Sequence, residues 1–368
     1  MSSPRRLDLR RSYDGLLRRA AGRAAATATT GAGGLGAGRA GAAGRAADAG
    51  RDRRAGGGRR RVPPCPCRRS RGRPRRRRLR ARGTRAPGAS PQARVSEAAR
   101  LIPAWSLPAG GAGAIAVARR WPDELTREWA WGGSTGRGAR VCVVDSGVET
   151  DHPGVGPVQR AVVVEARPEG EPAVEEDEEG DLCGHGTACA GIIRSLAPDC
   201  ELTSVRVLGA GYTGSGGNLL AGLRWAIETG ADVVNMSLST TKRQFAELLH
   251  ELADSAYFRR TVIVASAHNM PVESYPWRFA SVISVGSHEE VDPLVFYYNP
   301  SPPVEFFARG VGVDVPWVGG GTLRCTGNSF ATPHIAGICA LLKAKHPDLT
   351  PFEVKSVLHA TASNIAAP

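Results

Sequence analysis

The sequence predicts an α/β protein with a mainly parallel central sheet and helices on both faces, preceded by a disordered N-terminal head. From about residue 120 onward, short apolar runs alternate with helical patterns, which is typical of βαβ units. Residues 1–99 are instead rich in Ala, Gly, Arg and Pro and nearly free of aromatic and β-branched residues. Such a segment cannot bury enough apolar surface to offset the entropy of ordering. We therefore predict a disordered head over residues 1–99 and a folded domain over residues 100–368.

The first elements of the folded domain surround a long apolar run. Residues 125–131 form a short amphipathic segment that leads into a glycine-rich loop. The run that follows, residues 140–144, is continuously apolar after its first residue and ends at Asp145, as expected of a parallel strand covered on both faces. Residues 161–165 predict a second strand, and the acidic segment 169–181 after it predicts a solvated loop.

The rest of the domain alternates between extended and helical patterns. The extended patterns predict strands over residues 201–207, 232–236, 261–265 and 280–285, and the helical patterns predict helices over residues 187–196, 219–229, 245–256, 331–345 and 351–362. Two helix ends carry local signals: Gly230 stops one helix, and Thr350 with Pro351 opens the last one. Strands that alternate with helices in this way form a parallel sheet with helices on both faces.

The formal charge of the 368-residue chain, +13, describes neither of its parts. Residues 1–100 hold 28 arginines, no lysine and five acidic residues and carry +23, whereas residues 101–368 carry −10. The arginine-dense segment 51–85 predicts a weak, salt-dependent contact with polyanions through their phosphates. Arg, Ala, Gly and Pro also share GC-rich codons, so a stretch joined to the gene by a mistaken start remains an open alternative for the head.

Three short sequence motifs contain candidate catalytic residues: Val143-Val144-Asp145-Ser146-Gly147, Gly184-His185-Gly186-Thr187 and Gly327-Asn328-Ser329-Phe330-Ala331-Thr332-Pro333. Taken singly, Asp145 could be a turn former at a strand end, His185 a loop residue and Ser329 a helix N-cap. Those explanations are independent, so the probability that all three hold together is small. Because Asp, His, Ser is one of the chain orders in which a catalytic triad occurs, we identify these residues as a candidate triad.

Through these three motifs the chain resembles the subtilases, the subtilisin-like serine peptidases (peptidase family S8), and the resemblance covers residues 120–365. The resemblance implies a three-layer subtilisin-like fold and a serine endopeptidase that cuts polypeptides through an acyl-enzyme. His185 would take the proton of Ser329 and return it to the leaving amine, while Asp145 holds the other ring nitrogen. Asn269 follows a strand, as the oxyanion-hole Asn of the family does, and is expected to take that role.

The resemblance also implies two substrate-binding segments, one that pairs with an extended substrate and one that flanks the primary specificity pocket. The expected residues are Gly214, Ser215 and Gly216 in the first segment, and Ser237, Leu238 and Ser239 in the second. The family usually has Gly at the positions of Ser239 and His268, and Thr at that of Asn328. These departures keep one alternative open, a catalytically impaired binding protein on the same fold.

No metal and no cofactor are expected. The stretch between His185 and Ser204 is shorter than in many subtilases and lacks the Asn-rich loop that forms their strong calcium site, so a calcium requirement is not carried over. No Cys and His spacing typical of zinc is present. The acidic run 175–179 stands shortly before His185, and its charge is expected to raise the pKa of that imidazole, more so at low salt.

The sequence also bears on the cellular compartment of the protein and on the redox state of its cysteines. No run reaches the roughly 18 apolar residues that a membrane-spanning helix needs, and arginines interrupt the N-terminal segment where a secretory signal would be apolar. The six cysteines after the head favour a reducing, cytoplasmic compartment. Cys183 and Cys325 lie two and four residues before His185 and Ser329. Free thiols are favoured there over a disulfide, because nearness alone does not establish bridging geometry.

Overall fold

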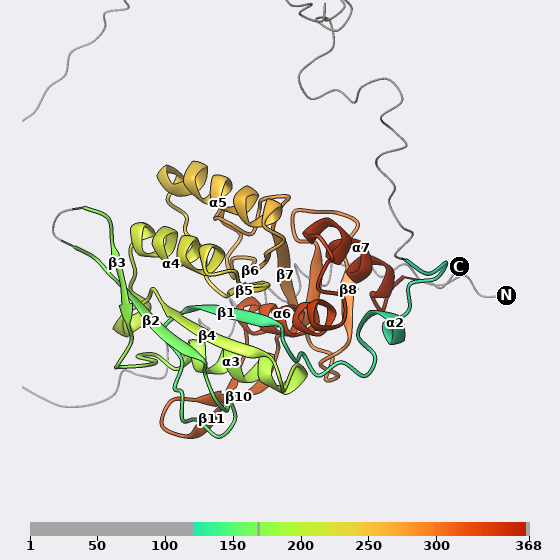
Figure 1. Ribbon diagram of the computed structural model, residues 1–368, viewed down its shortest axis with the longest axis horizontal. Coiled ribbons are helices and arrows are strands. Elements are labelled where there is room, and N and C mark those ends of the chain that lie inside the picture. The colour runs from blue at the N-terminus through green and yellow to red at the C-terminus, as the bar shows by residue number, and fades with distance from the viewer. Residues whose placement is uncertain (1–120, 168–169, 366–368) are drawn as a thin grey trace, which may run out of the picture. The chain divides into compact units, whose positions relative to one another are not determined.

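The computed structural model describes residues 121–167 and 170–365, and Figure 1 shows how their elements are arranged. The central feature is a nine-stranded sheet with the strand order β3-β2-β4-β1-β5-β6-β7-β9-β8. Neighbouring strands are parallel except at the two edges, where β3 and β8 are antiparallel to their neighbours. The strands are β1 (Arg140–Asp145), β2 (Arg160–Glu165), β3 (Ala173–Glu176), β4 (Glu201–Arg206), β5 (Val233–Met236), β6 (Val262–Ser266), β7 (Ile283–His288), β8 (Phe296–Tyr298) and β9 (Phe306–Arg309).

A separate antiparallel hairpin and six α-helices complete the described part of the chain. The hairpin consists of β10 (Val313–Trp317) and β11 (Gly321–Cys325). The helices are α2 (Arg127–Trp131), α3 (His185–Leu196), α4 (Gly216–Glu228), α5 (Ala246–Phe258), α6 (Asn328–Lys345) and α7 (Pro351–Thr361), with short 3-10 turns η3 (Ala210–Tyr212) and η4 (Arg243–Phe245).

Helices cover both faces of the sheet because its central strands are apolar on both sides. In β1, Val141 and Val143 belong to the core cluster that includes α3, α6 and α7, whereas Cys142 and Val144 belong to the cluster that includes α4 and α5. Figure 1 shows α4 and α5 on one side of the sheet and α3 and α6 on the other. The predicted three-layer architecture with a mainly parallel sheet is therefore confirmed.

Every predicted strand and helix is present, with bounds that differ by at most three residues. Two of these differences concern the candidate site: α3 begins at His185 and α6 begins at Asn328, so His185 and Ser329 both stand in the first turn of a helix. Strands β8–β11 were not predicted, because three to five residues are too few for a periodic pattern and β11 is largely exposed. Strand β3 was hidden in the acidic segment.

The predicted head, residues 1–99, lies outside the described residues, and so does the beginning of the predicted folded domain up to residue 120. Within residues 121–167 and 170–365, no helix combines the length and the apolar character that crossing a bilayer requires.

Candidate active site

Asp145 is the last residue of β1 and lies at the carboxyl end of the parallel sheet, between β4 and β5. Its side chain is fully buried. Oδ1 accepts two hydrogen bonds, one from the backbone N–H of Ser146 and one from Nδ1 of His185, each at 2.8 Å. A carboxylate only accepts hydrogen bonds, so Nδ1 of His185 carries the proton and Nε2 is left as the basic nitrogen.

His185 is the first residue of α3, and the glycines on both sides of it allow a close approach to Asp145. Gly184 adopts φ +88°, and a Cβ there would lie 2.4 Å from Cε2 of Trp317. A Cβ at Gly186 would lie 1.9 Å from the carbonyl oxygen of Gly147. Only glycine fits both positions, so the Gly-His-Gly sequence is required for α3 to begin at this place.

The pKa of His185 is raised above its ordinary value. Burial is the largest single influence and lowers the pKa, but the charge of Asp145, the hydrogen bond to Asp145 and the charge of Asp181 together outweigh it. The imidazole therefore binds a proton more tightly than a free histidine, which suits a group that must take a proton from a hydroxyl.

Ser329 is the second residue of the 18-residue helix α6, so its side chain lies at the positive end of a helix dipole. Its carbonyl oxygen accepts a hydrogen bond from Oγ of Ser237 at 2.8 Å. The ring of the adjacent Phe330 lies 5.3 Å from the ring of His185, so the start of α6 contacts the start of α3. Within the described residues no hydrogen bond joins the side chains of His185 and Ser329; in substrate-free enzymes this bond often tightens only when substrate binds.

The turn before Ser329 is held against the sheet by Asn328. Its backbone N–H donates to Oδ1 of Asn269 at 2.9 Å, which leaves Nδ2 as the donor edge of that amide. The buried Asn328 side chain accepts from the N–H and Oγ of Ser287 and donates to the carbonyl oxygen of Ala267. Asn328, where the family usually has Thr, therefore links the end of β6 to the end of β7 through its side chain.

Gly327 leaves a small space between Ser329 and Asn269. A Cβ at residue 327 would lie 3.3 Å from Oγ of Ser329 and 3.5 Å from Nδ2 of Asn269. The hydroxyl of Ser329 and the amide of Asn269 therefore border one common volume.

Of the two expected substrate-binding segments, residues 237–239 pass directly beside Ser329. Ser237 is buried and bonds the carbonyl oxygen of Ser329, as described above. Oγ of Ser239 donates to Oγ of Ser274 at 3.0 Å, so the hydroxyl that replaces the usual Gly has a partner inside the protein.

The other expected segment, residues 214–216, leads into the start of helix α4. Gly216 is the first residue of α4 and is buried against Phe245. Ser215 is the N-cap of α4, with Oγ accepting from the N–H of Asn218 at 3.0 Å. The expected substrate-pairing segment thus ends at the capped start of α4, and its contact with substrate stays a prediction.

Two further residues beside His185 were not predicted. The exposed Tyr212 presents its ring edge-on to that of His185 at 6.0 Å. Sγ of Cys189 lies 3.9 Å from Oδ2 of Asp145 and 3.7 Å from the carbonyl oxygen of Ser329. Cys189 follows His185 by four residues in one helix, and this spacing could have identified it. The position of Tyr212 depends on tertiary contacts and left no local signal.

Asp145, His185 and Cys189 form the one group of described residues whose donor atoms could hold a metal ion, all within 4.8 Å of one another. Burial, with the charge of Asp145, raises the pKa of Cys189 well above its ordinary value, so the thiol stays protonated. All six cysteines in the described residues are free, Cys183 and Cys325 among them.

Two other buried histidines have structural partners. Nε2 of His152 bonds the carbonyl oxygen of Gly321 at 3.0 Å, and its Nδ1 accepts from the N–H of Gly154. Nδ1 of His334 donates to the carbonyl oxygen of Phe330 at 2.9 Å, and burial lowers the pKa of His334 to about 4, so the ring remains neutral.

The acidic run 175–179 is not a solvated loop throughout. It begins in β3, which pairs antiparallel with β2, and Asp177 is buried and bonds the guanidinium of Arg206 through both carboxylate oxygens at 2.8 and 3.0 Å. Glu179 bonds the same guanidinium at 2.8 Å. The carboxylates that raise the pKa of His185 are Asp145 and Asp181, and neither belongs to the run.

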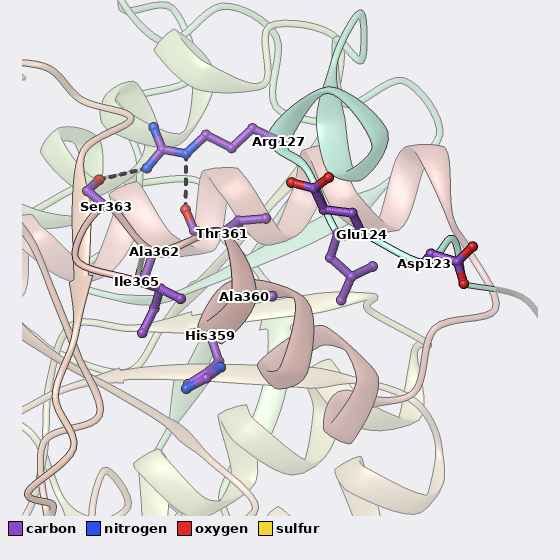
Figure 2. Close-up of a pocket in the computed structure, with 10 residues that line it drawn as sticks. Asp123, Glu124, Arg127, His359, Ala360, Thr361, Ala362, Ser363 and Ile365 are labelled. Carbon is purple, nitrogen blue, oxygen red and sulfur yellow. Dashed lines mark hydrogen bonds between the residues drawn. The ribbon is translucent and has the colours of Figure 1, made fainter. Parts of the chain in front are cut away.

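A cavity of about 690 Å³ lies between the segment before α2 and the end of α7, as Figure 2 shows. Arg127 extends along it and donates to the carbonyl oxygen of Thr361 at 3.0 Å and to Oγ of Ser363 at 2.7 Å. No candidate catalytic residue lines this cavity. The convergent groups with a shifted pKa, which mark an active site more strongly than volume does, lie at the carboxyl end of β1.

Known proteins of one family are similar to this chain. The profile of the subtilase family matches residues 136–368. The chain is 32% identical over 246 residues to subtilisin Savinase of Lederbergia lenta, a match that covers 64% of this chain and 87% of that protein. It is 32% identical over 244 residues to the M-protease of Shouchella clausii (strain KSM-K16), covering 63% of this chain and 61% of that protein. A solved structure of a cold-adapted subtilisin-like serine proteinase matches with a TM-score of 0.51 and 25% identity, over 63% of this chain and 86% of that chain. The chain therefore belongs to the subtilase family, a family of serine endopeptidases.

Proposed function

We propose that this protein hydrolyses peptide bonds through an acyl-enzyme formed on Ser329. The observation that carries the proposal is the hydrogen bond between Asp145 and His185, formed beside the start of α6 where Ser329 stands. Oγ of Ser329 attacks the peptide carbonyl while Nε2 of His185 takes its proton and then gives it to the leaving amine. Asp145 holds Nδ1–H and stabilises the imidazolium. In the second half of the reaction His185 takes a proton from water, which attacks the ester. The imidazolium then returns the proton to Oγ of Ser329 as the carboxylic acid product leaves.

The oxyanion of the tetrahedral intermediate would be bound by two donors, Nδ2 of Asn269 and the backbone N–H of Ser329. The first N–H groups of a helix have no partner within the helix, so that of Ser329 is available. The positive end of the α6 dipole favours the same negative charge. Nδ2 of Asn269 and the attacking Oγ of Ser329 both border the space that Gly327 leaves open.

The catalytic domain is proposed to span residues 100–368 and to use no metal and no cofactor in the reaction. Polypeptides are the proposed substrates, with residues 237–239 beside the scissile bond because Ser237 bonds the carbonyl of Ser329. The arginine-dense segment 51–85 is proposed as a separate, weak contact for polyanions.

Turnover of casein and of fluorogenic peptides by the purified full chain tests this function. We expect hydrolysis by the wild type, a loss of more than about 10⁴-fold in kcat for Ser329→Ala and for His185→Ala, and no change for Ser301→Ala, which removes an exposed hydroxyl from the loop between β8 and β9. A folded wild type without turnover would favour the alternative, a binding protein on the subtilase fold, to which the replacements at Ser239 and His268 point.

A further inference from the structure

The carboxylate of Asp181 accepts five hydrogen bonds from the segments around Asp145 and His185. Oδ1 accepts from Oγ of Ser146 at 2.8 Å, from the N–H of Cys183 at 2.9 Å and from the N–H of Gly184 at 2.8 Å. Oδ2 accepts from the N–H of Thr187 at 2.8 Å and from its Oγ1 at 2.7 Å. A carboxylate offers about four lone-pair sites, so the acceptor capacity of Asp181 is fully used.

On the side of α3, Asp181 does what an N-cap side chain does elsewhere. The N-cap residue Gly184 has no side chain to accept from the first turn of the helix. Asp181 accepts from the N–H groups of Gly184 and Thr187 instead and places a negative charge at the positive end of the helix. His185 lies between these two anchored residues, so its backbone position depends on where Asp181 holds the turn.

On the side of β1, the link runs through Ser146. Its backbone N–H donates to Oδ1 of Asp145, the same oxygen that bonds Nδ1 of His185. Its hydroxyl donates to Asp181 and accepts from the N–H of Gly186 at 3.1 Å. The end of β1 and the start of α3 are thus joined twice, once by the Asp145–His185 bond and once through Ser146 and Asp181.

We propose that Asp181 is a positioning residue, which fixes the start of α3 on the end of β1 and thereby sets the orientation of His185 toward Asp145 and Ser329. This inference rests on the proposed function. Asp181 acts through His185 and not through substrate, so its loss should lower kcat and leave KM nearly unchanged. Because a displacement of about 1 Å at a reacting group costs about 100-fold, we expect a 10- to 100-fold fall in kcat.

The pH dependence of activity separates this positioning role from a role in the stability of the fold. The titratable groups that face His185 are Asp145 from β1, Asp181 from the loop before α3, Cys189 from α3 and Tyr212 from η3. The pKa values of Cys189 and Tyr212 are both raised, so these groups stay neutral at acid and neutral pH. Only the two carboxylates carry charge there, and both raise the pKa of His185. Removing the charge of Asp181 therefore moves the acid limb of activity to lower pH.

The test compares Asp181→Asn with Glu178→Gln in the full chain, since both variants remove one negative charge from the same segment and Glu178 is exposed. In Asp181→Asn the amide NH₂ must face either the N–H of Thr187 or the donors at Oδ1, so the anchor is broken. We expect a 10- to 100-fold lower kcat on the alkaline plateau, an unchanged KM and an acid limb at lower pH. Glu178→Gln should match the wild type in all three measurements.

Two results would overturn the proposal. Both require that the plateau kcat and the acid limb of Asp181→Asn equal those of the wild type. With an unchanged melting temperature Asp181 would have no role in the site, and with a lower melting temperature it would serve fold stability alone. If Asp181→Asn does not fold, Ser146→Ala cuts the same link from the other end and should lower kcat about 10-fold without moving the limb; an unchanged kcat would contradict us. Failure of the proposed function would show first, as a wild type without turnover.

Discussion

The backbone N–H of Asn328 donates to Oδ1 of Asn269 at 2.9 Å, so the residue before Ser329 determines which edge of the Asn269 amide faces the site. With Oδ1 occupied by the N–H of Asn328, Nδ2 is the donor of the amide, which lies beside Gly327. A donor that is fixed before substrate arrives needs no reorganisation when negative charge develops, which is the condition under which an oxyanion hole is effective.

Replacing Asn269 by Asp tests the donor separately from the anchor. Asn269→Asp keeps an oxygen that can accept from the N–H of Asn328 but removes the Nδ2 donor. We expect the fold to be retained and kcat to fall about 100- to 1000-fold, the range measured for this kind of donor in subtilisin itself, with little change in KM. Steady-state kinetics check this, and a kcat within a few-fold of the wild type would show that Asn269 does not bind the oxyanion.

Gly327→Ala is expected to block the site without unfolding the protein. The φ of Gly327 is 163°, an extended conformation that alanine also adopts. Its Cβ would occupy the volume between Ser329 Oγ and Asn269 Nδ2, so we expect kcat/KM to fall about 100-fold with an unchanged melting temperature. Gly321→Ala is the matched control, because a Cβ there meets nothing within 4 Å. Equal activity of the two variants would place the reacting carbonyl elsewhere.

The acid limb of activity should depend on Asp145 and Asp181 and not on the acidic run. Since His185 must be neutral to act as a base and its pKa is raised, the limb lies above the ordinary value of about 6.5. Three of the four glutamates of the run already pair with arginines: Glu175 with Arg167, Glu176 with Arg160 and Glu179 with Arg206. Changing Glu175, Glu176, Glu178 and Glu179 together to Gln should therefore leave the pH profile and its salt dependence unchanged. A limb that moves to lower pH would show that the run acts on His185 after all.

The ion pair between Arg206 and Asp177 should matter for stability far more than its exposed neighbour. The two side chains are 8% and 0% exposed, against 50% and 65% for Arg160 and Glu176. Arg206→Ala leaves the Asp177 charge buried without its partner and should lower the free energy of unfolding by about 3–5 kcal/mol. Arg160→Ala should cost less than about 1 kcal/mol. Urea unfolding of both variants measures the difference, and equal losses would contradict the assignment of Asp177 as a buried charge.

The parts of the site that could be predicted carry their pattern within a few residues. Asp145 ends an apolar strand, His185 stands between two glycines, and Ser329 precedes a long apolar helix. Asp145 and Asn269 follow the parallel strands β1 and β6, whose carboxyl ends meet at one edge of the sheet, so their proximity follows from the alternation of strands and helices. The same alternation was enough to predict the three layers of the fold.

The parts that could not be predicted depend on contacts between distant segments. Asp181 stands in an acidic stretch that resembles a solvated loop, and its hydrogen bond from Ser146, 35 residues earlier, leaves no local pattern in the sequence. Tyr212 reaches His185 from a 3-10 turn without any periodic pattern.

The most direct test of the central claim is where a fluorophosphonate probe attaches to the full chain, located by mass mapping of the peptides. We expect one adduct, on Ser329, that is lost on heat unfolding and in Ser329→Ala and is strongly slowed in His185→Ala, because the hydroxyl is activated only by the folded Asp145–His185 pair. A folded wild type that remains unlabelled at Ser329, or that is labelled there equally well after His185→Ala, would contradict this claim.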